Sequence, residues 1–277
     1  MRSGPDRERL VVSAMQAWLT RRGQGFADWL NAWARVFSFT GVALIGALSP
    51  STYNKATRQV VQKQIYFTAW QILPGFALFS ALFSVLIIEI MGRNANAYGL
   101  YAYALELIVR VLVLEILPLM TALFVALRTG AAINTEVALM QIQNELGALE
   151  RIGIDPFRLE LLPRVVGGTI SVLALTAVNI VIALVLARIM IIDLNPWSLP
   201  PGEFARVIGK VLDLPAIGVL WAKTFAFGLA VTVIPISEGL NTPKKLFYAP
   251  IAVLRGMVRL FFALMVIEFA ALTALYV

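Results

Sequence analysis

The residues of this 277-residue chain that could do chemistry are charged side chains placed inside long apolar segments. Glu106 and Arg110 stand four residues apart, the spacing at which two side chains pair on one helix face. Glu115, in the same segment, has no partner at that spacing, and Lys223 and Glu268 lie in two further segments. An ionisable group at the centre of a bilayer costs about 2.5–3.5 kcal/mol on insertion scales. Each of these residues is therefore a candidate functional residue.

Several kinds of site are excluded by residues that the chain lacks. It contains no cysteine and no histidine, which removes disulfides, thiol nucleophiles, Ser-His and Cys-His pairs and imidazole metal sites. No segment has the G-x-x-x-x-G-K-[ST] pattern of a phosphate-binding loop, so ATP is not hydrolysed by that route. We therefore assign no catalytic residue and no metal site. An intramembrane enzyme is a weak alternative, because most of its chemistries need the missing side chains.

The composition requires that membrane-spanning elements position these charges. Hydrophobic residues make up 60% of the chain and charged residues 14%, with a mean hydropathy of +0.82. A soluble domain carries about 25% charged and roughly 45–50% apolar residues, so this chain cannot cover a globular surface with polar groups. Lipid admits only helices or closed barrels, and no alternating strand pattern is present. We therefore predict an all-α polytopic membrane protein.

We expect five spans, each an apolar segment long enough to cross the bilayer. They run over residues 65–91, 99–127, 165–190, 217–236 and 251–277. The chain then divides into an arm over residues 1–64 and a five-span domain over residues 65–277. Phe83, on the first span, is a candidate wall residue for an apolar substrate, although packing against lipid is the commoner role of such a side chain.

The first 64 residues carry nine Lys and Arg against three acidic residues. Within residues 26–48, one helical face carries Phe26, Trp29, Leu30, Trp33 and Phe37. The fully apolar part, residues 42–48, is far shorter than the ~20 residues needed to cross the membrane core. We expect a cytoplasmic arm followed by an amphipathic helix in the membrane surface. A partner-bound or partly disordered arm is the alternative.

The distribution of basic residues orients the spans. They gather in the arm, in the 128–164 connection and in the 239–250 loop, whereas acidic residues offset them in the 191–216 connection. The positive-inside rule places the first three regions and the N-terminus in the cytoplasm and leaves the C-terminus outside. In the outer connection, two prolines precede a short helix that we expect over residues 203–214.

The cytoplasmic connection over residues 129–164 has the clearest local signals. Gly130 is expected to end the second span, and a helix follows with Glu136 in its first turn. Gly153 is expected to end that helix, and Asp155, followed by a proline, to cap the next. Two short helices joined by an exposed glycine corner suit insertion into a partner's groove. A helix that merely packs under the membrane is the alternative.

Residues in and around this connection resemble a family of permeases. Glu145, Gly153 and Leu162-Pro163 are loosely similar to the E-A-A…G…L-P loop by which permeases of ATP-binding-cassette (ABC) importers dock on their ATPases. More specifically, the chain resembles the MlaE/YrbE permease family in Leu114-Glu115, Pro118, Arg128-Thr129-Gly130, Thr135-Glu136, Met140, Leu149, Gly153-Ile154-Asp155-Pro156 and Pro163-Arg164. Lys223 and Glu268 extend the resemblance toward the C-terminus.

The resemblance implies a fold and a set of partners. The fold would be an N-terminal interfacial helix plus five transmembrane helices, with a cytoplasmic coupling helix between spans 2 and 3, in a bacterial inner membrane. The chain would be the permease subunit of an ABC transporter that moves phospholipid or a related lipid between that membrane and a periplasmic MCE protein oligomer. Its expected partners are a second permease copy, two ATPase subunits that bind ATP and Mg²⁺, and a small cytoplasmic accessory subunit. No cofactor is expected on this chain, and nucleic acid is not an expected partner.

Roles for individual residues follow from the resemblance and from spacing together. Contacts with the ATPase are expected from Glu136, Met140, Glu145, Leu149, Gly153 and Asp155. Substrate contacts are expected from Glu106, Arg110, Leu114, Glu115 and Phe83, of which Glu115 matches the family glutamate. Leu114 stands where the family usually has an arginine, so Arg110, one turn earlier, is expected to supply the cation. Lys223 and Glu268, at similar expected depths, should form an ion pair that fixes span against span.

A proton-coupled secondary transporter is the alternative from another class. It would use Glu106 with Arg110, or Glu115, as a proton relay inside the membrane. Many such transporters are built from inverted repeats, and the five expected spans show no evident inverted halves. The ATP-driven permease is therefore the preferred interpretation.

Overall fold

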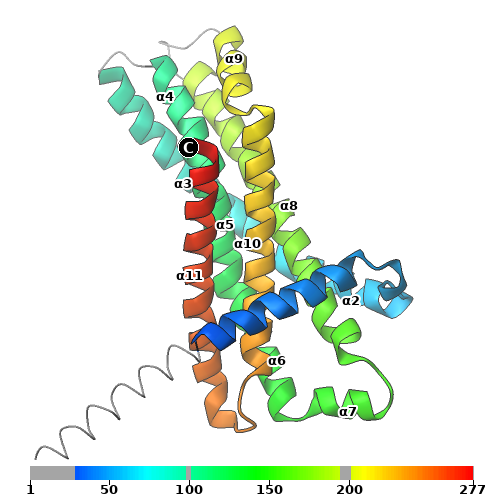
Figure 1. Cartoon of the computed structure of the whole chain (residues 1–277). Coiled ribbons are helices and arrows are strands. Elements are labelled where there is room, and N and C mark those ends of the chain that lie inside the picture. The colour runs from blue at the N-terminus through cyan, green and yellow to red at the C-terminus, as the bar shows by residue number, and fades with distance from the viewer. Residues whose placement is uncertain (1–28, 98–100, 194–200, 277) are drawn as a thin grey trace, which may run out of the picture.

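The computed structural model describes residues 29–97, 101–193 and 201–276, and the regular structure in these ranges is helical (Figure 1). The predicted all-α class is confirmed. The expected arm before residue 29 and the beginning of the second span, at residues 99 and 100, lie outside the described residues.

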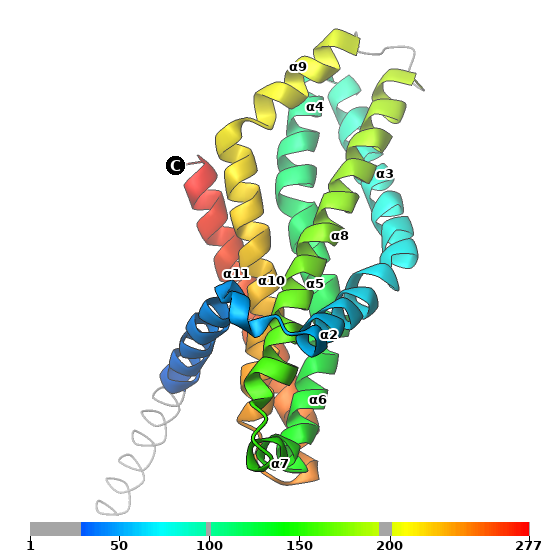
Figure 2. The ribbon, with the colours of Figure 1, turned by 90° about the vertical axis from the view of Figure 1, so that its right-hand side faces the viewer.

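Six helices in the described part of the chain are long and apolar enough to cross a membrane. They are Trp29–Leu48, Thr57–Asn94, Leu105–Ile142, Phe157–Ile191, Leu214–Leu240 and Leu246–Leu275. The last five correspond to the predicted spans with somewhat different ends, and Figures 1 and 2 show their main parts running along one bundle. Trp29–Leu48 instead crosses this bundle obliquely in both views. Length and composition do not separate that helix from the spans, so its position in the membrane surface stays a prediction.

The individual elements divide these long helices more finely. The first span and its approach comprise η1 (Pro50–Thr52), α2 (Lys55–Ile65), η2 (Tyr66–Trp70) and α3 (Leu73–Ala97). The second comprises α4 (Tyr101–Leu107), η3 (Ile108–Ile116), α5 (Leu117–Val125), η4 (Ala126–Gly130) and α6 (Ala131–Ile142). The rest comprise α7 (Glu145–Arg151), η5 (Phe157–Leu161), α8 (Leu162–Arg188), η6 (Ile189–Asp193), α9 (Pro201–Val211), α10 (Leu214–Leu240), η7 (Leu246–Tyr248) and α11 (Ala249–Tyr276).

The second span is longer than predicted, because the break expected at Gly130 does not occur. Helical structure continues without interruption from Tyr101 to Ile142. Gly130 lies in the π-helical turn η4, where a Cβ atom would meet the Val231 carbonyl oxygen of α10 at 3.3 Å. A π turn accommodates an extra residue without ending a helix. The glycine therefore permits a close helix contact, and the expectation that it ends the span is wrong.

A second π-helical segment, η3, precedes Pro118, which lies in the first turn of α5. Proline has no backbone N–H and its ring clashes with the carbonyl one turn earlier, so an ordinary α-helix would kink or break there. A local change of hydrogen-bond register lets the chain pass this point as a helix. Segments of this kind are rare and are frequently found at functional sites.

The centre of the molecule is α10, which packs against α6, α8 and α11. The main apolar core lies among these helices and α5, and Val125, Phe227 and Leu260 are fully buried in it. Close approach of α6 to α10 depends on Gly239, where a Cβ atom would meet the Cβ atom of Val137 at 2.8 Å. The four-helix contact is therefore tight and leaves little freedom for one helix to move alone.

The aromatic face of Trp29–Leu48 packs on the bundle. The rings of Trp29 and Trp33 meet edge to face with centroids 6.0 Å apart, and Trp33 lies 6.2 Å from the ring of Phe262 on α11. On another face, Phe39 meets Phe157 of η5 with centroids 5.7 Å apart. The helix is thus held to α11 and to the beginning of the third span by aromatic contacts.

The short helix predicted in the 191–216 connection is present as α9. It begins at Pro201 and ends at Val211, slightly earlier than the expected residues 203–214. The chain then starts α10 at Leu214, because the Asp213 side chain caps it by accepting a hydrogen bond from the Ala216 N–H at 2.9 Å.

Candidate functional site

Three charged side chains from three different spans meet inside the bundle. Lys223 of α10 pairs with Glu115 of η3, and its Nζ lies 3.2 Å from Oε2 of Glu268 on α11. The side chains of Lys223, Glu115 and Glu268 are 2%, 12% and 9% exposed. We call this set the charge cluster. It is nearly enclosed by protein, and the helices that supply it are the ones that pack around the core.

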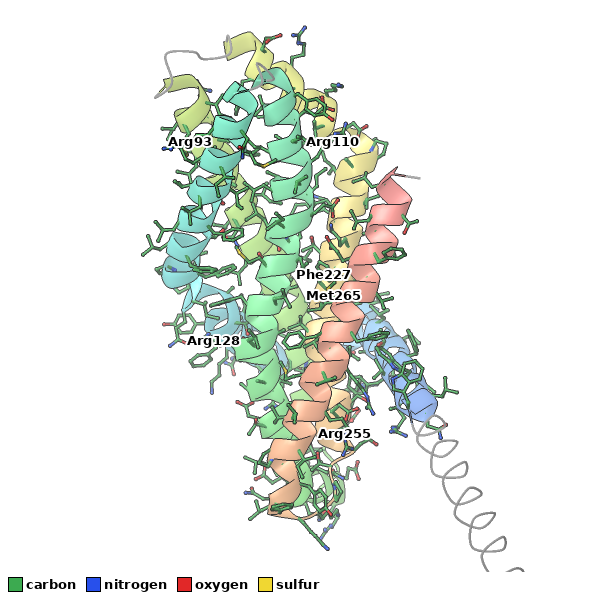
Figure 3. The ribbon with its side chains drawn as sticks, turned by 90° about the vertical axis from the view of Figure 1, so that its left-hand side faces the viewer. Arg93, Arg110, Arg128, Phe227, Arg255 and Met265 are labelled. Atoms are coloured by element: carbon green, nitrogen blue, oxygen red, sulfur yellow. The ribbon has the colours of Figure 1, made fainter. Side chains whose placement is uncertain are left out.

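The charge cluster lies roughly midway along the bundle. Phe227 follows Lys223 by one turn of α10, and Met265 precedes Glu268 by about one turn of α11. Figure 3 shows Phe227 and Met265 at the same level, with Arg110 toward the end that carries α9 and Arg255 toward the end that carries α7. The cluster is therefore far from both ends of the bundle.

The cluster contains one ammonium and two carboxylates. Burying ions is costly unless they are paired, and the pairing of Lys223 with Glu268 supplies the ion pair that similar depth indicates. Glu115, which has no partner within its own helix, shares the same lysine. Sequence spacing could not find this contact, because Glu115 and Lys223 are 108 residues apart. With all three groups ionised, the cluster has one negative charge in excess.

A second, more open set of charges lies at the α9 end. Arg110 Nη2 lies 3.1 Å from Glu106 Oε1, as their spacing indicates, and Lys210 of α9 lies 3.0 Å from Glu106 Oε2. Arg110 is 33% exposed and Lys210 64% exposed. Arg110 and Glu115 thus have different partners, and their expected contacts with substrate stay predictions.

Two other residues expected to contact substrate lie in an apolar core at this end of the bundle. Leu114 is 2% exposed and belongs to the buried cluster that also contains Leu105 and Leu112. Phe83 of α3 is partly buried against the same cluster. Leu114 is therefore enclosed by apolar side chains in this structure. The expected substrate contacts of Leu114 and Phe83 stay predictions.

The connection between the second and third spans forms two helices where the sequence indicates one long helix. α6 ends at Ile142, and Asn144 adopts a left-handed conformation, with φ of 59°, before α7 begins at Glu145. Asparagine is one of the few non-glycine residues that adopt this conformation readily. The polypeptide therefore turns at Asn144, and the expectation of a single helix over about residues 136–150 is wrong.

The corner after α7 has the predicted local structure. Gly153 has φ of +80°, and the N–H groups of Gly153 and Ile154 donate to the carbonyls of Glu150 and Leu149, each at 3.0 Å. This is the paired hydrogen-bond pattern that ends many helices at a glycine. Asp155 then accepts a hydrogen bond from the Phe157 N–H at 3.0 Å, which caps the next helix.

The residues expected to contact an ATPase fall into two groups. Glu145, Gly153 and Asp155 are exposed around α7, and Leu149 is half-buried. Large apolar side chains flank the glycine, with Ile152 70% and Ile154 39% exposed. These positions form an accessible tip that combines a sharp corner, acidic side chains and apolar surface.

The second group faces a buried arginine. Arg164 of α8 lies 3.4 Å from Glu136 and 3.2 Å from Glu160, and it approaches the Met140 sulfur at 3.9 Å. Its side chain is 10% exposed. Glu136 and Met140 thus attach α6 to α8 through Arg164. The sequence analysis singles out Arg164 only as part of the family resemblance and does not predict this contact.

Two grooves lie beside Trp29–Leu48. A groove of about 600 Å³ has almost entirely apolar walls, formed by Trp29, Leu30, Trp33, Val36, Phe37 and Thr40 with side chains of α10 and α11. A groove of about 640 Å³ on the opposite face of this helix is lined by Asn31, Arg35 and Ser38 among others. Neither is lined by the charge cluster or by Arg110. The helix therefore lies between two grooves, and charged or amide side chains line part of the second one only.

Comparison with known proteins gives one family for most of the chain. The model of the family "Permease MlaE" matches residues 61–274. The intermembrane phospholipid transport system permease protein MlaE of Haemophilus influenzae is 27% identical over 252 residues, which cover 86% of this chain and 93% of that protein. A probable ABC transporter permease protein of Rickettsia typhi is 24% identical over 213 residues, or 76% of this chain and 78% of the relative. One of Synechocystis is 26% identical over 128 residues, or 46% of this chain and 48% of the relative.

Proposed function

This chain belongs to the MlaE permease family, and from that premise we propose that it is the membrane subunit of an ABC transporter that moves phospholipid between the inner membrane and a periplasmic MCE protein. The relatives from Rickettsia typhi and Synechocystis are named as probable ABC transporter permease proteins, which supports assigning the hydrolysis of ATP to a separate subunit. ATP and Mg²⁺ bind there, and this chain provides the pathway for the lipid.

One observation supports a mechanism for this function: Glu115 and α6, the helix that precedes α7, lie on one continuous helix. The helix Leu105–Ile142 has 38 residues and bears Glu115 near one end and α6 at the other. At 1.5 Å per residue, Glu115 and Ile142 are about 40 Å apart along its axis. An ATPase bound at α7 would act on the end of α6 through the turn at Asn144, and a displacement of α6 would reach the charge cluster through continuous helical backbone.

The charge cluster suits a phospholipid headgroup. A headgroup presents a phosphate, which an ammonium attracts, and often a cationic group, which a carboxylate attracts. Lys223 and Glu115 can offer these charges when the helices that carry them separate. Arg110, a third of which is exposed, is a further headgroup contact nearer the α9 end. The apolar side chains around both sites would face the acyl chains.

The assembly that follows has two permease copies, two ATPase subunits, an MCE oligomer and a small cytoplasmic accessory subunit. The α7 end, where the basic 128–164 and 239–250 segments lie, faces the cytoplasm. The N-terminus is then cytoplasmic and the C-terminus periplasmic. α9 lies on the periplasmic side, where it can meet the MCE protein.

The experiment that tests the function is lipid transfer from proteoliposomes that contain the complete complex. We expect labelled phospholipid to pass between the liposome and the MCE protein when ATP is supplied, and to do so equally well after an ionophore has collapsed any proton gradient. Transfer that needs a proton gradient and ignores ATP would overturn the proposal and favour the secondary transporter. Arg110→Met in the same assay reports separately on the outer headgroup contact.

A further inference from the structure

Large apolar side chains are exposed in the turn between α10 and α11. Leu246 is 66%, Phe247 79% and Tyr248 37% exposed, and two lysines, Lys244 and Lys245, precede them. An exposed cluster of this kind on a soluble surface marks a site of interaction. On a membrane protein it could instead be covered by lipid, so its depth decides which applies.

The turn lies outside the hydrocarbon layer. α11 has 28 residues and is therefore about 42 Å long, whereas the hydrocarbon core is about 30 Å thick. Arg255 and Arg259 lie in its first half, while Glu268 is the sole charged residue between residues 260 and 276. A core about 30 Å thick takes about 20 residues of helix, so counting back from Tyr276 the membrane-embedded part begins near Met257. Phe247 precedes Met257 by ten residues, or about 15 Å along a helix, so the turn lies outside the layer of acyl chains.

The turn is joined to the helix that is expected to meet the ATPase. Lys244 Nζ donates a hydrogen bond to Oδ1 of Asn144, the residue at which α6 turns into α7, at 2.8 Å. Thr242 fixes the other side of the turn by donating to the Glu238 carbonyl of α10 at 3.1 Å. Figures 1 and 2 both show α7 and this turn at the same end of the molecule.

α7 and the turn adjoin the ends of three long helices, Leu105–Ile142, Leu214–Leu240 and Leu246–Leu275. The same three helices carry the charge cluster. α6 is connected to α11 by buried Asn134, whose Nδ2 donates to the Ala252 carbonyl at 3.3 Å, and α10 is connected to α11 by an ion pair of buried Glu238 with half-buried Arg259. The turn therefore moves with α6, α10 and α11 together. Directly after the turn, α11 begins at Ala249, and this helix bears Glu268.

We propose that residues 244–248 form a second docking element, which binds the same ATPase subunit as α7. This inference rests on the proposed function. Leu246 and Phe247 would enter an apolar depression on the ATPase, and Lys244 and Lys245 would face acidic side chains at its rim. Because α7 follows the helix of Glu115 and this turn begins the helix of Glu268, one ATPase would hold the ends of both carboxylate-bearing helices.

The chain offers a matched pair of variants to test this. Leu246→Ala/Phe247→Ala removes the exposed Leu-Phe pair of the turn, whereas Leu78→Ala/Phe79→Ala removes an adjacent Leu-Phe pair of α3 that is 64% and 52% exposed. We expect affinity for the purified ATPase to fall about tenfold or more in the first, as loss of a buried aromatic anchor does, and to be unchanged in the second. Both variants should insert and elute like the unmodified chain.

Cross-linking separates failure of this inference from failure of the proposed function. The chain has no cysteine, so Phe247→Cys and Ile152→Cys each give a single thiol. We expect both to cross-link to the ATPase in the assembled complex. If Ile152→Cys cross-links while Phe247→Cys does not, and the Leu246→Ala/Phe247→Ala variant binds normally, the second docking element is refuted and α7 coupling stands. If neither residue cross-links and no ATPase co-purifies, the proposed function itself is refuted.

Discussion

Lys223 Nζ lies 3.2 Å from Glu268 Oε2, and this contact joins α10 to α11 inside the bundle. The same ammonium is shared with Glu115 on the second span. Because a buried ion is stabilised mainly by its partners, Lys223 holds three helices in register, and its loss affects all of them.

Replacing Lys223 with methionine should destabilise the folded chain by about 3–5 kcal/mol, because two buried carboxylates are then left without a cation. The measurement is thermal or denaturant unfolding in detergent. Glu115→Gln/Lys223→Met/Glu268→Gln, which removes all the charges while keeping similar volumes, should regain most of that stability. Equal instability of the single and triple variants would show that packing, and not charge, fixes the helices.

Glu115→Gln should slow lipid transfer roughly tenfold to a hundredfold while leaving assembly intact. The change removes one charged interaction of about 1.5–3 kcal/mol with the headgroup, and Lys223 keeps its pairing with Glu268. Glu89→Gln is the control, since Glu89 pairs with Arg93 on the exposed surface of α3. Transfer at the unmodified rate would make Glu115 a structural residue.

Gly153→Val should reduce the ATPase stimulation that the permease provides. The φ of +80° at this position costs an ordinary L-residue about 1–2 kcal/mol, so the corner after α7 would be displaced. Gly153→Asn should retain most of the stimulation, because asparagine tolerates this conformation. Stimulated hydrolysis that is equal in both variants would mean that the ATPase does not use this corner.

Arg164→Met should lower the amount of lipid moved per ATP hydrolysed. The arginine connects Glu136 on α6 with Glu160 and α8, so its removal frees α6 from the third span. The ratio of lipid transferred to phosphate released is the quantity to measure. Arg164→Lys keeps the charge and should restore part of the ratio. A normal ratio with Met would assign Arg164 to stability alone.

Single cysteines at Ser38 and Ser49 test the position of the helix Trp29–Leu48. If the helix lies in the cytoplasmic membrane surface, neither thiol should react with a membrane-impermeant reagent in intact cells, and both should react in inside-out vesicles. Labelling of Ser49→Cys from the periplasm would make this helix a sixth span and reverse every orientation that follows it.

Features that depend on composition and local backbone preference were determined by the sequence itself. Apolar segments of sufficient length predict the membrane-spanning helices, and the lack of Cys and His excludes whole classes of chemistry. Gly153 and Asp155 predict their corner because a positive φ and a helix cap each depend on a few neighbouring residues.

Only the tertiary structure decided how the charges are shared and where the helices turn. Glu115 and Lys223 are 108 residues apart and meet because α10 packs against the second span. The spacing of residues along one helix cannot predict such a contact. Gly130 is expected from the sequence to end the second span, but in the folded chain it allows α10 to approach, and the helix continues through a π-helical turn. Pairing of distant charges and the continuity of long helices depend on which surfaces pack together, a property of the folded molecule as a whole.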